Sequence, residues 1–220
     1  MKALVFGATG MVGRGVLLEC LRDPEIDLAQ TVGRSATGIE HAKLRELVLP
    51  DLMNYDLLES QLSDFDACFF CLGVSSGGLI EAEYTRITYG ITLAAANVLV
   101  RLNPKMAFVY VSGAGTDATE RGRSMWARVK GKTENALLQL PFRSAYMFRP
   151  AVIQPLDGVR SKTPAYQLFY GLTKPFLPLL RALAPSYFTT TRELGRAMIA
   201  VAKRGAPNKI IESADIRDLA

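Results

Sequence analysis

The sequence predicts an α/β fold of the Rossmann-like, doubly wound type, with a parallel sheet flanked by helices. Three observations predict it. A short apolar run stops at a glycine-rich loop, and apolar residues at helical spacing follow this loop. Strand-like and helix-like segments then alternate through the first 150 residues. The strand-like runs are continuously apolar, as in strands that helices cover on both faces.

The individual elements follow this pattern in order. Strands are expected at residues 2–6, 28–32, 46–49, 66–73, 106–113 and 143–150. Helices are expected at residues 11–22, 81–102 and 124–139. Right-handed crossovers between these strands predict the sheet order 3-2-1-4-5-6.

The chain is expected to form one domain over residues 1–220, with residues 1–150 as the Rossmann core. Residues 151–220 carry most of the prolines and an aromatic segment, a helix after Thr191 and a short strand in NKIIES. These features predict a small C-terminal lid that contributes to the substrate site.

Composition limits the function classes. The net charge of +5 comes from scattered basic residues, which does not predict nucleic-acid binding. Three cysteines predict no disulfide framework, and no signal peptide or transmembrane run is recognised, so a cytoplasmic location is expected. No metal site is expected, because His41 is the single histidine and the strand residues Cys68 and Cys71 point to opposite faces.

The glycine-rich loop GATGMVG is the first candidate site. Gly7 allows the turn out of the strand, Gly10 lets a pyrophosphate approach the backbone, and Gly13 lets the first helix pack on the first strand. A helix N-terminus here offers backbone N–H groups and a partial positive charge to a phosphate. The predicted dinucleotide-binding residues of this loop are Gly7, Thr9, Gly10, Met11, Val12 and Gly13.

The second strand ends in TVGRS, which bears on the choice of dinucleotide. An acid about 20 residues after the glycines would bind the ribose 2′-hydroxyl of NAD, but Arg34 and Ser35 stand here instead. A guanidinium and a hydroxyl suit a 2′-phosphate, so NADP(H) is predicted to be preferred over NAD(H). An ordinary exposed surface arginine is the alternative interpretation of Arg34.

Further candidates follow the third and fourth strands, where open α/β sheets bind ligands. Asp51 and Leu52 are predicted at the adenine, and Leu72, Gly73 and Val74 at the nicotinamide ribose. The alternative is that these are ordinary loop residues.

The motifs GATGMVG, CLG, VSGAG, WARVK, FRPAVIQP and TTTRELGRAMIAVAKRG together resemble the atypical short-chain dehydrogenases, related to NAD-dependent epimerases and dehydratases. The similarity is greatest to the Tat-interacting-protein-like branch. It implies NADP binding between the carboxyl edge of the sheet and the C-terminal segment. It also implies that the backbone of Pro150, Ala151 and Val152 holds the nicotinamide carboxamide, although a simple turn is the alternative.

The same resemblance implies a serine, tyrosine and lysine triad for proton transfer. The serine falls on Ser112, and the lysine, which holds the cofactor ribose and lowers the tyrosine pKa, falls on Lys130. Trp126 occupies the tyrosine position. Trp126 and Lys130 share a helix face, yet an indole N–H does not give up its proton near neutral pH. The usual general acid is therefore missing.

Three functions remain open. In the first, the chain is a cofactor-binding sensor or regulator. In the second, it is an active NADPH-dependent oxidoreductase, epimerase or dehydratase acting on a small molecule. Its proton would then come from Ser75, Ser76, Tyr166 or Tyr170, or from water after hydride addition to an activated alkene. In the third, residues 164–188 contact a membrane surface or a partner protein. A helix rich in alanine and leucine near residues 93–98 leaves both a monomer and a homodimer open.

Overall fold

The computed structural model describes residues 1–55, 58–159 and 184–220, and its centre is a seven-stranded, entirely parallel sheet. The strand order is β3-β2-β1-β4-β5-β6-β9. The strands are β1 (Lys2–Phe6), β2 (Leu28–Gly33), β3 (Leu44–Val48), β4 (Ala67–Phe70), β5 (Ala107–Val111), β6 (Ser144–Arg149) and β9 (Ile210–Glu212). The predicted fold class is confirmed, and the short strand predicted in NKIIES is β9, which extends the sheet at its edge beside β6.

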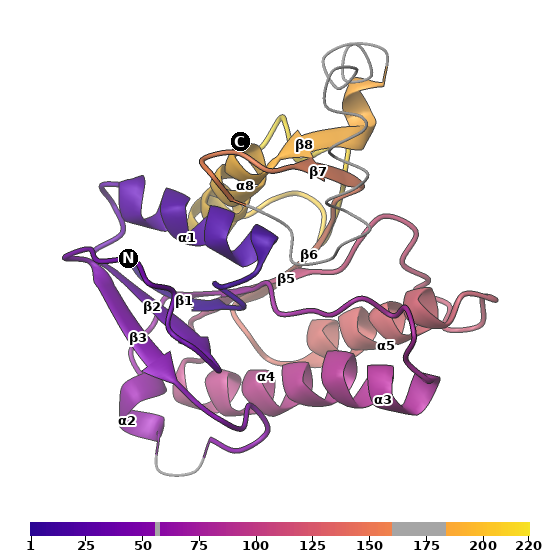
Figure 1. Ribbon diagram of the computed structural model, residues 1–220, viewed down its shortest axis with the longest axis horizontal. Helices are drawn as coiled ribbons and strands as arrows, with labels where there is room; N and C mark the ends of the chain where they lie inside the picture. The colour runs from indigo at the N-terminus through magenta and orange to yellow at the C-terminus, as the bar shows by residue number, and fades with distance from the viewer. Residues whose placement is uncertain (56–57, 160–183) are drawn as a thin grey trace.

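Helices cover both faces of this sheet (Figure 1). One face carries α1 (Met11–Arg22) and α8 (Thr191–Arg204). The other carries α2 (Glu59–Leu62), α3 (Glu81–Thr85), α4 (Ile91–Leu102) and α5 (Met125–Gln139). All residues of β4 and β5 are buried, which explains why their sequences are continuously apolar.

The predicted helix over residues 81–102 is interrupted by a π-helical segment, η1 (Arg86–Gly90). Sequence periodicity did not indicate it, because a π-turn inserts one residue without changing the apolar composition. The segment joins α3 to α4, and its Gly90 lies close to Met53 in the loop after β3.

The described residues of the C-terminal segment, 151–159 and 184–220, contribute to the core as well as to the carboxyl edge of the sheet. Helix α8 packs against α1, with Gly15 facing Thr191 and Gly195 facing Glu19. Thr190 and Glu193 form a capping box at the start of α8. A separate two-stranded parallel sheet pairs β7 (Val152–Gln154) with β8 (Phe188–Thr190), preceded by the short helix η2 (Pro185–Tyr187).

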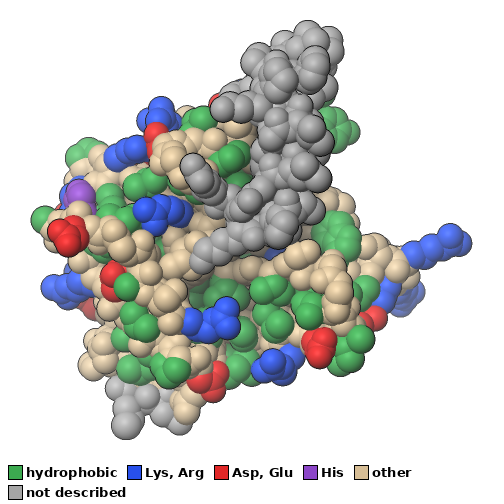
Figure 2. Space-filling model, in the orientation of Figure 1, with side chains coloured by type: hydrophobic (Ala, Val, Ile, Leu, Met, Phe, Trp, Pro, Cys, Tyr) green, Lys and Arg blue, Asp and Glu red, His purple; other side chains and the backbone are tan. Residues whose placement is uncertain are grey.

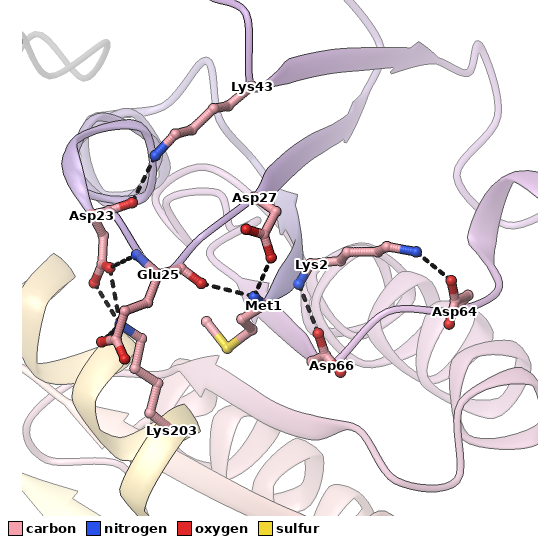
Figure 3. A network of polar contacts seen from close by, with 9 residues as sticks. All are labelled: Met1, Lys2, Asp23, Glu25, Asp27, Lys43, Asp64, Asp66 and Lys203. Carbon is pink, nitrogen blue, oxygen red and sulfur yellow. Dashed lines mark hydrogen bonds and ion pairs between the residues drawn. The ribbon is translucent and has the colours of Figure 1, made fainter.

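A network of polar contacts ties the chain together at the amino ends of the strands (Figure 3). Lys203 of α8 forms ion pairs with Asp23 at 2.8 Å and Glu25 at 2.6 Å, just beyond the end of α1. The amino group of Met1 contacts Asp27 at 2.7 Å. This network lies at the amino ends of the strands, whereas the glycine-rich loop lies at their carboxyl ends. The carboxyl ends therefore remain available for ligands.

Other predicted features are placed as follows. Cys68 belongs to the hydrophobic cluster on one face of the sheet and Cys71 packs against the cluster on the other, as their spacing predicted. His41 is exposed. Lysines and arginines are dispersed over the face that Figure 2 shows. Within the described residues, no helix is both long and apolar enough to span a bilayer.

Candidate functional site

The glycine-rich loop joins β1 to α1 in the geometry that the spacing predicted. Gly7 has a positive φ of 76°, and a Cβ atom at Gly13 would lie 2.2 Å from the Gly7 carbonyl oxygen. Gly10 is the N-cap of α1 and no side chain caps the helix. The first backbone N–H groups of α1 therefore lack intrahelical partners and are donors that an anion can use.

A pocket of about 840 Å³ opens over this loop. Arg34 and Ser35 line it from the end of β2, and Asp51 and Leu52 from the loop after β3. Arg34 is exposed, while Asp51 accepts a hydrogen bond from the backbone N–H of Met53 at 2.8 Å. The volume lies within the range of ordinary cofactor pockets.

A second pocket of about 620 Å³ continues from the first toward β5 and β6. The two pockets share the lining residues Gly10, Cys71, Leu72, Gly73, Val74 and Ser75. They therefore form one groove along the carboxyl edge of the sheet. The residues that line this groove extend from the loop after β3, across the glycine-rich loop, to the end of β6.

Lys130 lies in the wall of the second pocket and is buried. Its Nζ donates hydrogen bonds to the Tyr110 hydroxyl at 3.1 Å and to the Val111 carbonyl at 3.3 Å. A Cβ atom on Gly73 would lie 3.7 Å from this Nζ, so the amine sits beside the loop after β4. Burial lowers the pKa of Lys130 to about 8, although the carboxylate of Glu134 opposes the shift.

Ser112 contacts a buried carboxylate that sequence reasoning missed. Its hydroxyl lies 2.5 Å from Glu134 Oε1, and the Glu134 side chain is fully buried. Arg149 forms a two-pronged ion pair with Glu134 at 2.5 and 3.1 Å, and a further one with Glu212 of β9 at 3.0 Å. Because this carboxylate accepts the Ser112 proton, the Ser112 oxygen can offer the pocket only its lone pairs.

Trp126 lines the same pocket from the first turn of α5, with its ring about 3.5 Å from the position of a Cβ atom on Gly115. Tyr84 of α3 lines the pocket too, which the sequence did not indicate. Burial raises the pKa of its phenol. The phenol of Tyr84 is therefore protonated at neutral pH.

Most predicted site residues meet in the groove. Pro150 and Ala151 line the second pocket, and the Pro150 carbonyl accepts a hydrogen bond from Ala114 at 2.9 Å. Gly13 is buried beneath the loop, and Val152 pairs with Phe188 in the small sheet; neither lines the groove. Ser75 and Ser76 lie in the groove wall, whereas Tyr166 and Tyr170 fall outside the described residues, as does most of the segment 164–188. No cluster of metal-ligating side chains occurs in the described part of the chain.

Comparisons with known proteins agree with this architecture. No protein-family model matches the chain. The mitochondrial protein FMP52-2 of Scheffersomyces stipitis is 28% identical over 153 residues, which cover 69% of this chain and 66% of that protein. The mitochondrial protein fmp52-2 of Aspergillus oryzae is 25% identical over 224 residues, covering 97% of this chain and 94% of that protein.

Solved structures share the fold. The Bordetella bronchiseptica enzyme WbmF in complex with NAD⁺ superposes with a TM-score of 0.68 at 16% identity, covering 99% of this chain and 76% of that one. A short-chain dehydrogenase/reductase from Saccharomyces cerevisiae gives a TM-score of 0.66 at 15% identity, covering 100% of this chain and 98% of that one. The fold that the resemblance to short-chain dehydrogenases predicted is confirmed by these structures, and the curated relatives in sequence are FMP52 proteins.

The expected cytoplasmic location is contradicted by these relatives, which are named as mitochondrial proteins. The expectation depended on recognising no targeting segment and on having few cysteines. A low cysteine count indicates only that a protein does not depend on disulfides, so it does not distinguish the cytoplasm from a mitochondrial location.

Proposed function

We propose that the chain binds NADP(H) in the groove and acts as a cofactor-binding sensor or regulatory protein rather than as an ordinary ketone reductase. The observation that carries this proposal is the continuous groove, which joins the glycine-rich loop and Arg34 to Ser112, Trp126 and Lys130. Its parts fit a dinucleotide: the uncapped start of α1 offers N–H donors to the pyrophosphate, and Arg34 offers a guanidinium to a 2′-phosphate.

Two features of the second pocket support binding over ketone reduction. An ordinary carbonyl site needs two donors, and Trp126 supplies no acidic proton at the position of the first. The second donor, the Ser112 hydroxyl, is directed to Glu134. A bound NADPH would supply hydride, but these two residues would leave the developing alkoxide without its usual stabilisation.

Lys130 remains suited to cofactor binding in the absence of the tyrosine. Its amine lies beside Gly73, where the chain carries no side chain between the amine and the groove. An ammonium at this position can donate to ribose hydroxyls. The loss of the tyrosine therefore removes a proton donor without removing this contact.

Titration of Trp126 fluorescence tests the proposal, because Trp126 is the single tryptophan and lines the pocket. NADP⁺ is expected to quench this emission at concentrations about ten- to a hundredfold lower than NAD⁺, since one charge-assisted contact from Arg34 is worth about 1.5–3 kcal/mol. Arg34→Gln should abolish most of this difference, and Arg45→Gln, an exposed arginine outside the groove, should preserve it. Absence of a response to either nucleotide would refute cofactor binding.

A second candidate function is reduction with another proton donor, and Tyr84 favours it. Its phenol lines the pocket that also contains Lys130 and Trp126. The protein should then consume NADPH with carbonyl compounds or activated alkenes, and Tyr84→Phe should slow the carbonyl reactions at least tenfold. Cofactor binding without any NADPH consumption over such a panel supports the sensor function instead.

A further inference from the structure

A second arginine, Arg86, lines the first pocket together with Arg34. Both side chains are exposed. Neither guanidinium forms an ion pair or hydrogen bond with any residue that the structure describes. Other arginines near the groove differ in this respect, because Arg128 pairs with Glu81 at 2.7 Å and Arg149 with Glu134.

The π-helical segment η1 places Arg86 on the wall of the groove. The backbone N–H of Ile91 donates to the Arg86 carbonyl five residues earlier, so the two residues stack one turn apart. Arg86, Ile87 and Ile91 consequently line the same pocket. This wall presents two apolar side chains with one cation beside them.

The two arginines reach the groove from different layers of the fold. Arg34 directly follows β2 in the sheet, whereas Arg86 belongs to η1, which leads into α4. Helix α1 covers one face of the sheet and α4 covers the other (Figure 1). The η1 segment therefore lies across the groove from the glycine-rich loop and the start of α1.

This placement separates the two phosphate groups of the cofactor. A pyrophosphate held by the start of α1 lies over the loop itself, and the adenosine extends from there toward β2 and β3. Arg34, at the end of β2, would then stand near a 2′-phosphate on the adenosine. Arg86, on the wall across from the start of α1, would stand near the pyrophosphate.

We propose that Arg86 is a cofactor-binding residue that holds the pyrophosphate of the dinucleotide from the wall opposite the glycine-rich loop. The proposal rests on the proposed NADP(H) binding. The Arg86 contact is made to a part of the molecule that NADP⁺ and NAD⁺ share. It contributes to affinity but not to the choice between them, which Arg34 makes.

Isothermal titration calorimetry of the full chain with NADP⁺ and with NAD⁺ tests this division of roles. Arg86→Met keeps most of the apolar stem and removes the charge. It should weaken binding of both nucleotides by a similar factor, about tenfold for one charge-assisted contact at an exposed site. Arg34→Gln should weaken NADP⁺ alone, and Arg45→Met, an exposed arginine of β3 outside the groove, should change neither.

The possible outcomes are distinct. Equal losses for the two nucleotides in Arg86→Met support the pyrophosphate contact. A loss confined to NADP⁺ would place Arg86 at the 2′-phosphate and overturn the assignment, as would unchanged affinity for both. If the folded wild-type chain binds neither nucleotide, the proposed function itself fails, and circular dichroism of each variant separates these results from unfolding.

Discussion

At the scale of single residues, the proposed function depends on three side chains. Lys130 lies beside the loop after β4, Trp126 stands where the resemblance implies an acidic phenol, and the Ser112 hydroxyl donates to Glu134. In the proposed function, the last two residues limit proton delivery and the first serves cofactor binding. Substitutions at these positions can therefore separate binding from turnover.

Trp126→Tyr is predicted to create proton delivery in the second pocket. The new phenol would stand four residues before Lys130 on the same face of α5, so it would lie near the amine that can lower its pKa. Reduction of a ketone probe by NADPH should rise by about 10²-fold or more. Trp126→Phe is the matched control, since it removes the indole without adding an acid. Equal rates in the two variants, with NADPH bound by both, would show that the missing phenol is not what limits turnover.

Lys130 should make the free energy of unfolding depend on pH. Its pKa is about 8 in the folded protein and 10.5 in the unfolded reference, so the unfolded chain binds more protons between these pH values. Wild-type stability should therefore rise from pH 8 to pH 10.5 relative to Lys130→Met, by about 2–3 kcal/mol. Urea unfolding of both proteins across this range measures the difference. Two parallel pH profiles would show that the folded pKa of Lys130 is not lowered.

At the scale of elements, the glycine-rich loop separates a packing role from a binding role. A Cβ atom at Gly13 would meet the Gly7 carbonyl oxygen at 2.2 Å, whereas one at Gly10, which lines the groove, would lie 3.3 Å from the same oxygen with no other close neighbour. The absence of a side chain at Gly13 allows the close contact between β1 and α1. The absence of a side chain at Gly10 keeps the groove above the loop open.

The pair Gly10→Ala and Gly13→Ala tests this separation. Gly13→Ala should lower stability by more than about 3 kcal/mol, because backbone atoms must move to relieve the contact. Gly10→Ala should stay within about 1 kcal/mol of wild type and lose NADP⁺ affinity at least tenfold. Thermal unfolding and nucleotide titration of both variants provide the comparison. Similar melting temperatures for the two would contradict the packing role of Gly13.

The elements also show what sequence patterns can predict. Continuous apolar runs and the glycine spacing predicted the parallel sheet, because these patterns reflect burial on both faces and close backbone approach. The handedness of the crossovers predicted the strand order. Tyr84, Arg86 and Glu134 were missed, since each lies in a helix whose periodicity reports packing against the sheet. Which of their side chains reach the groove depends on the π-helical segment and on the buried ion pair, and both are set by tertiary contacts.

At the scale of the whole molecule, the two ends of the chain stabilise each other. Helix α8 supplies the buried residues Leu194, Ala197, Met198, Ile199, Val201 and Ala202 to the cluster that also contains α1. The ion pairs of Lys203 with Asp23 and Glu25 add polar contacts across the same junction (Figure 3). The C-terminal residues are therefore part of the folding unit.

A chain that ends at Thr190 is predicted not to fold cooperatively, because one face of the sheet would lose its cover from α8 and the edge strand β9. A chain that ends at Asp218 retains both elements and should unfold within about 1 kcal/mol of wild type. Denaturant unfolding followed by circular dichroism distinguishes them. A cooperative transition in the shorter chain would show that residues 1–190 form an autonomous unit.

The hydrogen bonds of Lys130 to Tyr110 and Val111 have an evolutionary consequence. A lysine of α5 whose amine is anchored to the neighbouring strand β5 is maintained by selection for folding as well as by selection for chemistry. Among descendants of a common ancestor, it would persist after turnover has been lost, while an aromatic position at the pocket wall would drift freely. In such lineages, whether a relative is active would be indicated by the residue that it carries at position 126, and not by the presence of the lysine.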